Sequence, residues 1–190
     1  HVAVEGYDDI IIFPLFPQYA SSTTGSLHEL VMRLASPMNV IPSLRFISQY
    51  YSHPRFIEAW AENIGQYNPE DHDHILFSYH SLPIRQVERS HPGLAAASCN
   101  CAVSMPEHGK YCYRAACYET TRLIAARLGL KEGTYSTAFQ SRLTGNWLSP
   151  FTDQALHNLA AGGRKNVLVA APSFTADCLE TIVEIGDEYR

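Results

Sequence analysis

Five short apolar segments of strand length recur along this 190-residue chain, separated by segments with helical periodicity. The apolar segments are residues 10–13, 41–46, 75–79, 134–139 and 167–171. Helices are expected over residues 26–34, 53–64, 113–128 and 152–161, and again from about residue 179 toward the C-terminus. Ser26 and Glu29 form a capping-box pattern at the start of the first of these. Strands alternating with helices are typical of parallel sheets with crossover helices, so the sequence predicts an α/β fold.

Composition and charge exclude several classes of protein. With 46% hydrophobic and 17% charged residues the chain is a globular protein rather than a disordered one. Its formal net charge of -5 argues against a nucleic-acid partner, which requires a basic surface. Its apolar runs fall short of the ~20 residues that span a bilayer, which excludes an integral membrane segment. Peripheral membrane association and the oligomeric state stay open.

A change in composition near residues 42–54, which includes Tyr50 and Tyr51, predicts a passage between two α/β units. We expect residues 1–50 to belong to the first unit and residues 51–190 to the second. The second unit contains a cysteine-rich segment near residues 98–117.

Side chains that could bind a ligand or take part in catalysis follow the predicted strands. In open α/β sheets a ligand binds beyond the carboxyl ends of the strands. The segments at this position carry aromatic rings, hydroxyls, an imidazole and carboxylates, and they are residues 14–26, 80–83, 140–147 and 172–180. Such a mixture suits a large, flat, apolar ligand with polar appendages, without naming it.

His80 stands where the third strand is expected to end, a position from which an imidazole could act as a base or bind a metal ion. A histidine that is merely hydrogen-bonded into the strand end is an equal alternative. Glu180, Glu184 and Glu188 are spaced by four residues and would form one row on a helix. The row could conduct cations inward or protons outward, or it could be a capping residue followed by a solvated face.

Four of the five cysteines lie close together in the sequence: Cys99, Cys101, Cys112 and Cys117. Four thiolates suit Zn²⁺ or an iron–sulfur cluster, but the spacing matches neither zinc ribbons nor ferredoxins. Unliganded thiols or a disulfide are the alternatives, so the spacing leaves the metal open. We interpret the clustering as a sign of a reducing compartment.

Three segments resemble, in order and spacing, the successive signatures of ferrochelatases: residues 14–26, 76–83 and 174–181. Gln140-Ser141 and Trp147-Leu148 also resemble the family, so that the similarity runs from about Gly6 to Tyr189. The resemblance implies a chelatase-like fold of two Rossmann-like domains with parallel sheets and a porphyrin in the cleft between them. Compared with a whole family member, the first domain is expected to be incomplete in this chain.

The resemblance further implies an enzyme of haem biosynthesis that inserts Fe²⁺ into a porphyrin, both being substrates. His80 matches the active-site histidine and Glu180 its partner carboxylate, and the path of the substrate iron would include His80, Glu180, Glu184 and Glu188. The expected porphyrin-binding residues are Phe16, Tyr19, Ser22, Thr23, Trp147 and Phe174.

The chain departs from the family at several positions. Phe16 stands where a tyrosine is usual, and Cys178 where some members have histidine. The segment 98–112 is similar to an insertion, and because some members carry a [2Fe–2S] cluster on four cysteines, the resemblance favours this cluster over zinc on Cys99, Cys101, Cys112 and Cys117. A cytoplasmic location is expected.

Two other functions remain alternatives from the sequence. One is a non-catalytic module that binds a tetrapyrrole or a metal, and the other is a related cobalt or nickel chelatase. The joint presence of His80 and Glu180 favours an iron-inserting enzyme over the first. The sequence leaves open whether the porphyrin is protoporphyrin IX or coproporphyrin III.

Overall fold

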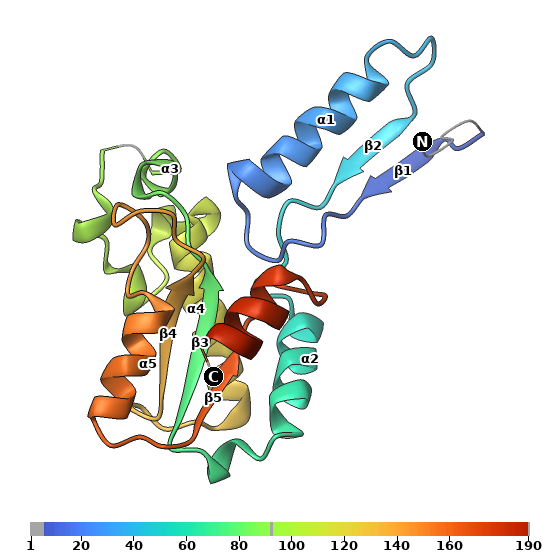
Figure 1. The fold of residues 1–190 in the computed structure, drawn as a ribbon. Helices are drawn as coiled ribbons and strands as arrows, with labels where there is room; N and C mark the ends of the chain where they lie inside the picture. The colour runs from blue at the N-terminus through green and yellow to red at the C-terminus, as the bar shows by residue number, and fades with distance from the viewer. Residues whose placement is uncertain (1–5, 92, 190) are drawn as a thin grey trace.

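Two parallel sheets form the framework of the chain in a computed structural model that describes residues 6–91 and 93–189. In the first sheet β1 (Asp9–Ile12) pairs with β2 (Ser43–Phe46). In the second, β3 (His74–His80) lies between β4 (Tyr135–Gln140) and β5 (Val167–Ala170). Each strand overlaps one of the five expected segments, and all pairings are parallel, which confirms the α/β prediction (Figure 1).

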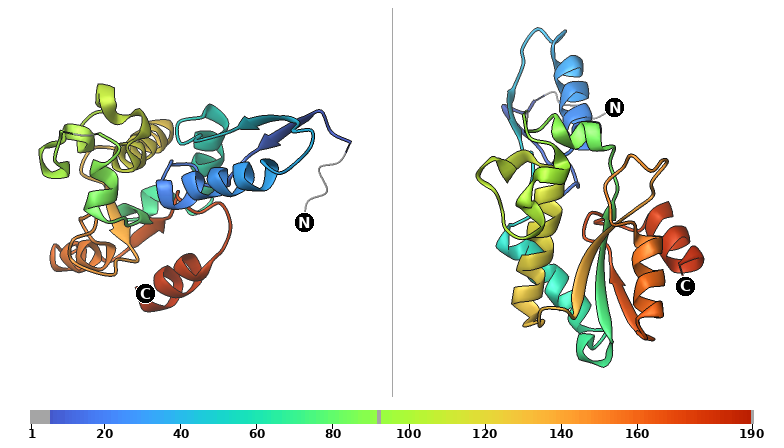
Figure 2. Two further views of the ribbon diagram at one scale, coloured as in Figure 1. Left: turned by 90° about the horizontal axis from the view of Figure 1, so that it is seen from above. Right: turned by 90° about the vertical axis from the view of Figure 1, so that its left-hand side faces the viewer.

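The expected helices are also present. They are α1 (Ser26–Ala35), α2 (Pro54–Gly65), α4 (Tyr113–Leu128) and α5 (Thr152–Ala161). Shorter elements that the sequence did not predict are α3 (Ile84–Glu88) and the 3₁₀ turns η2 (Pro69–Asp71), η3 (Ala96–Ser98), η4 (Asn100–Ala102) and η5 (Glu107–Tyr111). Figure 2 shows α2 and α4 on one side of the three-stranded sheet and α5 with the C-terminal helix on the other.

The central strand β3 lies in the hydrophobic core. Residues 74–79 are all buried, and Leu76, Phe77 and Tyr79 are completely inaccessible to solvent. A strand covered on both faces by helices has no solvent-facing side chains, and therefore reads as one continuous apolar run rather than an alternating one. The position of the site follows from this strand, because its carboxyl end carries His80.

The start of α1 differs from the capping-box prediction. The hydroxyl-rich segment Ser21–Gly25 forms a π-helical turn, η1, that runs directly into α1. Ser26 therefore lies inside a continuous helical segment, and its hydroxyl donates to the carbonyls of Ser22 and Thr23, each at 3.0 Å. A residue in this position cannot cap, because the amides that a cap would satisfy are already within a helix.

The C-terminal helix is a π-helix, η6 (Glu180–Glu188). In a π-helix the hydrogen bonds span five residues, as in the 3.1 Å bond from the Tyr189 amide to the Glu184 carbonyl. Glu184 turns toward the end of β4, where its carboxylate accepts from the Ser141 amide, whereas Glu188 is exposed. The two carboxylates therefore have different surroundings, and their shared row with Glu180 stays a prediction.

The segment between β2 and α2 connects the two sheets, and the boundary at residue 50 stays a prediction. No helix in the described ranges combines the length and apolarity needed to cross a membrane.

Candidate functional site

A cavity of about 360 Å³ lies where the segment after β1, the end of β3 and the segment after β5 meet. Its lining residues are Phe16, Gln18, Ala20, Ser22, Thr23, His80, Leu82, Tyr113, Ser173, Phe174, Cys178 and Glu180. One long-range hydrogen bond joins the segments after β1 and β5: Thr175 Oγ1 donates to the Leu15 carbonyl (3.1 Å). A second ties the segment after β1 to α4 (Tyr113–Leu128), because Gln18 Nε2 donates to Thr120 Oγ1 (3.2 Å). The cavity thus unites parts of all three sequence signatures.

His80, the last residue of β3, is held on three sides. Its backbone amide donates to Ser173 Oγ (3.1 Å), and its carbonyl accepts from the Tyr113 hydroxyl (2.8 Å). Its Nδ1 lies 2.6 Å from the Ser81 carbonyl. A carbonyl can only accept, so Nδ1 carries the proton and the lone pair of the neutral ring resides on Nε2.

Glu180, the first residue of η6, faces this lone pair. Its Oε1 lies 4.0 Å from His80 Nε2, and about one third of each side chain is exposed. The Phe174 ring lies beside the imidazole, with ring centroids 6.4 Å apart. A proton acceptor, a carboxylate and an aromatic surface therefore share one wall of the cavity. This arrangement is suited to bind a divalent cation weakly, or to accept protons from a ligand in the cavity.

Glu184 occupies a different environment from Glu180. Its Oε1 accepts from the Ser141 amide (2.7 Å) and the Tyr189 hydroxyl (2.6 Å), and its Oε2 accepts from the Ser141 hydroxyl and from Gln140 Nε2 (3.4 Å). Burial alone would raise the pKa of this carboxyl, but the hydrogen bonds from Ser141 and Tyr189 outweigh it and lower the pKa. Glu184 is thereby an ionised anchor for η6.

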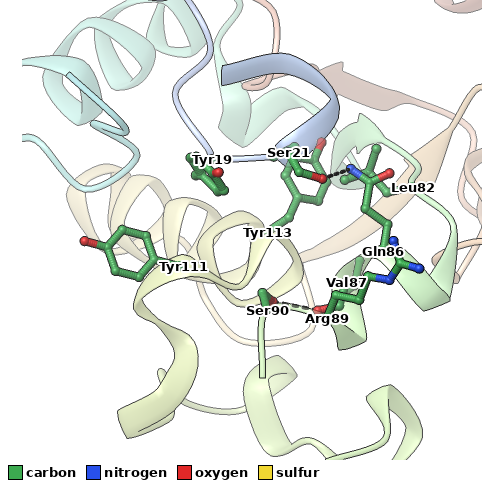
Figure 3. A pocket seen from close by; sticks show the side chains of 10 residues that line it. Tyr19, Ser21, Leu82, Gln86, Val87, Arg89, Ser90, Tyr111 and Tyr113 are labelled. Atoms are coloured by element: carbon green, nitrogen blue, oxygen red, sulfur yellow. Dashed lines mark hydrogen bonds between the residues drawn. The ribbon is translucent and has the colours of Figure 1, made fainter. Parts of the chain in front are cut away.

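The expected porphyrin-binding residues lie in three places. Phe16, Ser22, Thr23 and Phe174 line the cavity. Tyr19 lines a smaller neighbouring pocket of about 200 Å³, which shares Ala20, Leu82 and Tyr113 with the first (Figure 3). Trp147 forms an antiparallel bridge with Pro83, just after the strand end that carries His80.

The smaller pocket has a mainly apolar lining surface that also carries hydroxyl and amide groups. In Figure 3, Gln86 reaches across to Ser21, to which its Nε2 donates at 3.1 Å. Tyr113 lines both this pocket and the larger cavity, and it was missed by the sequence analysis. Tyr113 begins a helix far from any predicted strand end, so its position carried no signal. Gln18, Leu82 and Ser173, by contrast, lie in segments already selected by the strand-end rule.

The four clustered cysteines are all buried within the same apolar cluster, and all five thiols of the chain are free. Burial raises the pKa of Cys101 to about 12, and it also raises the pKa values of Cys112 and Cys117. Neighbouring thiols add to the rise in the pKa values of Cys101 and Cys117. Within residues 6–91 and 93–189, however, no three cysteine, histidine or acidic side chains gather in a way that could hold one metal ion.

Basic groups surround the cysteine-rich segment. Arg122 Nη1 donates to the carbonyls of Cys101 and Ala102, each at 3.2 Å, and the Arg114 charge lowers the pKa of Cys101 against the larger effect of burial. His108 Nε2 lies 3.5 Å from Cys99 Sγ. These groups would offset negative charge on the sulfur atoms.

Comparisons with known proteins agree on one family. The ferrochelatase family model matches residues 1–190. Among curated proteins, ferrochelatase of Legionella pneumophila (strain Corby) is 41% identical over 178 residues, covering 93% of this chain and 53% of that protein. Ferrochelatase of Pseudomonas putida (strain W619) is 37% identical over 194 residues, covering all of this chain and 57% of that protein. The chain thus spans somewhat more than half the length of these relatives.

Proposed function

This chain belongs to the ferrochelatase family, and we propose that its full-length protein inserts Fe²⁺ into a porphyrin during haem biosynthesis. The observation that carries the proposal is the cavity that joins the His80–Glu180 pair to the aromatic rings of Phe16 and Phe174. Aromatic side chains supply flat apolar area for a macrocycle, while the pair supplies the polar chemistry at its centre.

Metallation exchanges two pyrrole N–H protons for one Fe²⁺, so the site must accept protons and present a cation. We assign the first task to His80, because its Nε2 lone pair is kept free by the hydrogen bond at Nδ1. Glu180, 4.0 Å away, stabilises the resulting imidazolium and shares the proton load. An imidazole and one carboxylate bind Fe²⁺ weakly enough to release it to four porphyrin nitrogens.

The porphyrin is proposed to contact Phe16, Tyr19, Ser22, Thr23, Trp147 and Phe174. Four of these line the main cavity, and Tyr19 lines the adjoining pocket. For the iron path we propose His80 and Glu180 at its inner end and the exposed Glu188 at its outer end. Glu184 lies between Glu180 and Glu188 in the sequence. Its carboxylate would take part in the iron path while it stays hydrogen-bonded to Ser141.

We propose that Cys99, Cys101, Cys112 and Cys117 hold a [2Fe–2S] cluster. Each iron of such a cluster takes only two cysteine ligands, so it does not require three side chains to converge on one ion, as a zinc site would. The burial of all four thiols and the nearby arginines support this assignment. The cluster would hold the cysteine-rich loop against α4, and we assign it no role in metallation. The free thiols also support a reducing compartment, for which we propose the cytoplasm.

Anaerobic metallation assays on the full-length protein test the proposed function. Fe²⁺ is supplied with protoporphyrin IX or coproporphyrin III, and metalloporphyrin formation is followed by absorption. We expect turnover with at least one of them. Porphyrin binding without metallation would instead indicate a non-catalytic tetrapyrrole-binding module. Faster insertion of Co²⁺ or Ni²⁺ than of Fe²⁺ would indicate a related chelatase.

A further inference from the structure

Gln140 is the last residue of β4, and its neighbour in the parallel register of the sheet is His80. Its side chain is almost completely buried, at 1% exposure. A buried carboxamide must have hydrogen-bond partners, because an unpaired one would lose its bonds to water without replacing them. The partners of Gln140 lie on both elements that carry the candidate catalytic pair.

On the side of β3, Gln140 is bound twice. Its backbone carbonyl accepts from the Ser81 amide (2.8 Å), next to His80 in the chain. Its side-chain Oε1 accepts from the Ser78 hydroxyl (2.5 Å). Ser78 has a single hydroxyl proton, so the 2.8 Å contact between Ser78 and Thr152 must be donated by Thr152. A buried chain of hydrogen bonds thus runs from α5 through β3 to the amide of Gln140.

On the side of η6, the same amide donates from Nε2 to the backbone carbonyl of Glu180 (3.2 Å) and to Glu184 Oε2 (3.4 Å). Both partners are pure acceptors, which fixes the orientation of the amide: its nitrogen faces η6 and its oxygen faces Ser78. The rigid carboxamide of Gln140 therefore links β3, which ends at His80, to Glu180, the first residue of η6.

We propose that Gln140 is a positioning residue that sets the separation between His80 and Glu180. The two side chains are 4.0 Å apart and are not in direct hydrogen-bond contact, so their own interaction does not fix this distance. The spacing depends instead on how η6 is held against the sheet. The inference rests on the role proposed above for the pair, and it adds a residue that lines neither of the two pockets.

Gln140→Met tests this, because methionine keeps the length and volume of the side chain but removes all three hydrogen bonds of its carboxamide. In the full-length protein we expect kcat at saturating iron to fall about 10- to 100-fold, since small misplacements of reacting groups have effects of this size. The porphyrin KM should change little, because the walls of the cavity remain. Gln154→Met, on the exposed face of α5, is the matched control and should leave both parameters unchanged.

Ser78→Ala removes the hydroxyl that donates to Gln140 Oε1, and it should also lower kcat. In the double variant Ser78→Ala/Gln140→Met the effects should not add, because both act through one hydrogen-bonded unit. Additive effects on kcat, or a loss of stability in urea with unchanged kcat of the folded protein, would reduce Gln140 to a structural residue and overturn the proposal.

A second measurement is independent of turnover. Co²⁺ binding to the full-length protein is titrated by absorption. The part of the binding that is lost in Glu180→Gln is assigned to the His80–Glu180 pair. We expect Gln140→Met to weaken this part of the binding about tenfold. Unchanged Co²⁺ affinity in Gln140→Met would overturn the positioning role even if metallation proceeds. Absence of metallation by the unsubstituted protein would instead overturn the proposed function.

Discussion

The Tyr113 hydroxyl donates a 2.8 Å hydrogen bond to the backbone carbonyl of His80. Tyr113 is the first residue of α4 and directly follows Cys112 in the cysteine-rich segment. A single buried side chain therefore connects the cysteine-rich segment with the strand end that carries the candidate base.

Tyr113→Phe is expected to destabilise the protein by about 1 kcal/mol, because it leaves the His80 carbonyl without this donor. Urea unfolding of the full-length protein measures the change. The control is Tyr111→Phe, since Tyr111 is half exposed and lies in the neighbouring turn. Equal effects of the two substitutions would contradict a specific role for the Tyr113 bond.

His80→Ala is expected to reduce metallation by about 10²- to 10⁴-fold, the usual contribution of a positioned acid–base group. Porphyrin affinity should be retained, because Phe16 and Phe174 still form the apolar walls. Steady-state kinetics and porphyrin titration separate the two effects. His157→Ala, at an exposed position of α5, serves as control. A variant that keeps more than about a tenth of the rate would reject His80 as the main base.

Glu180→Gln and Glu188→Gln are expected to differ in kinetic profile. Glu180 faces His80 inside the cavity, so its substitution should depress kcat at saturating iron. Glu188 is exposed at the far end of η6, and its substitution should chiefly raise the iron concentration needed for half-maximal rate. Kinetics with iron as the varied substrate measure both parameters. Identical profiles would remove the division between chemistry and iron supply.

The anchoring of η6 should depend on pH through Glu184. Its pKa is lowered in the folded state by the bonds from Ser141 and Tyr189, against the effect of burial. A carboxyl with a lowered pKa stabilises the fold above its unfolded pKa of about 4.3, and the stabilisation is lost as the pH falls through the folded pKa. Hydrogen-exchange protection of residues 180–188 should therefore decrease on acidification. The same decrease in Glu184→Gln would show that another group is responsible.

Substitution of any one of the four clustered cysteines by serine is expected to remove the cluster and destabilise its loop. Anaerobically purified protein should contain two irons and two sulfides per chain, the stoichiometry of a [2Fe–2S] cluster, and Cys101→Ser should lack them. Cys178→Ser is the internal control, because the remaining cysteine lies at the cavity instead. One tightly bound zinc in colourless protein, or a disulfide among these cysteines, would contradict the cluster.

The sequence by itself determined the framework of this protein. The apolar run 75–79 predicted the central strand, and the pattern over 113–128 gave the bounds that α4 has in the structure. The position of His80 at the end of an expected strand marked it as a candidate site residue. These inferences succeed because burial of a strand or helix face is recorded locally, in the period of its apolar residues.

Only the tertiary structure decided how the site is assembled. Leu15 and Thr175 meet although 160 positions separate them, and no local pattern records that contact. The contact of Glu184 with Ser141 depends on how η6 packs against the end of β4, and Gln140 joins strand and helix through one buried amide. Periodicity reports which face of an element is buried, whereas the partners of a polar group depend on which distant segments pack against it.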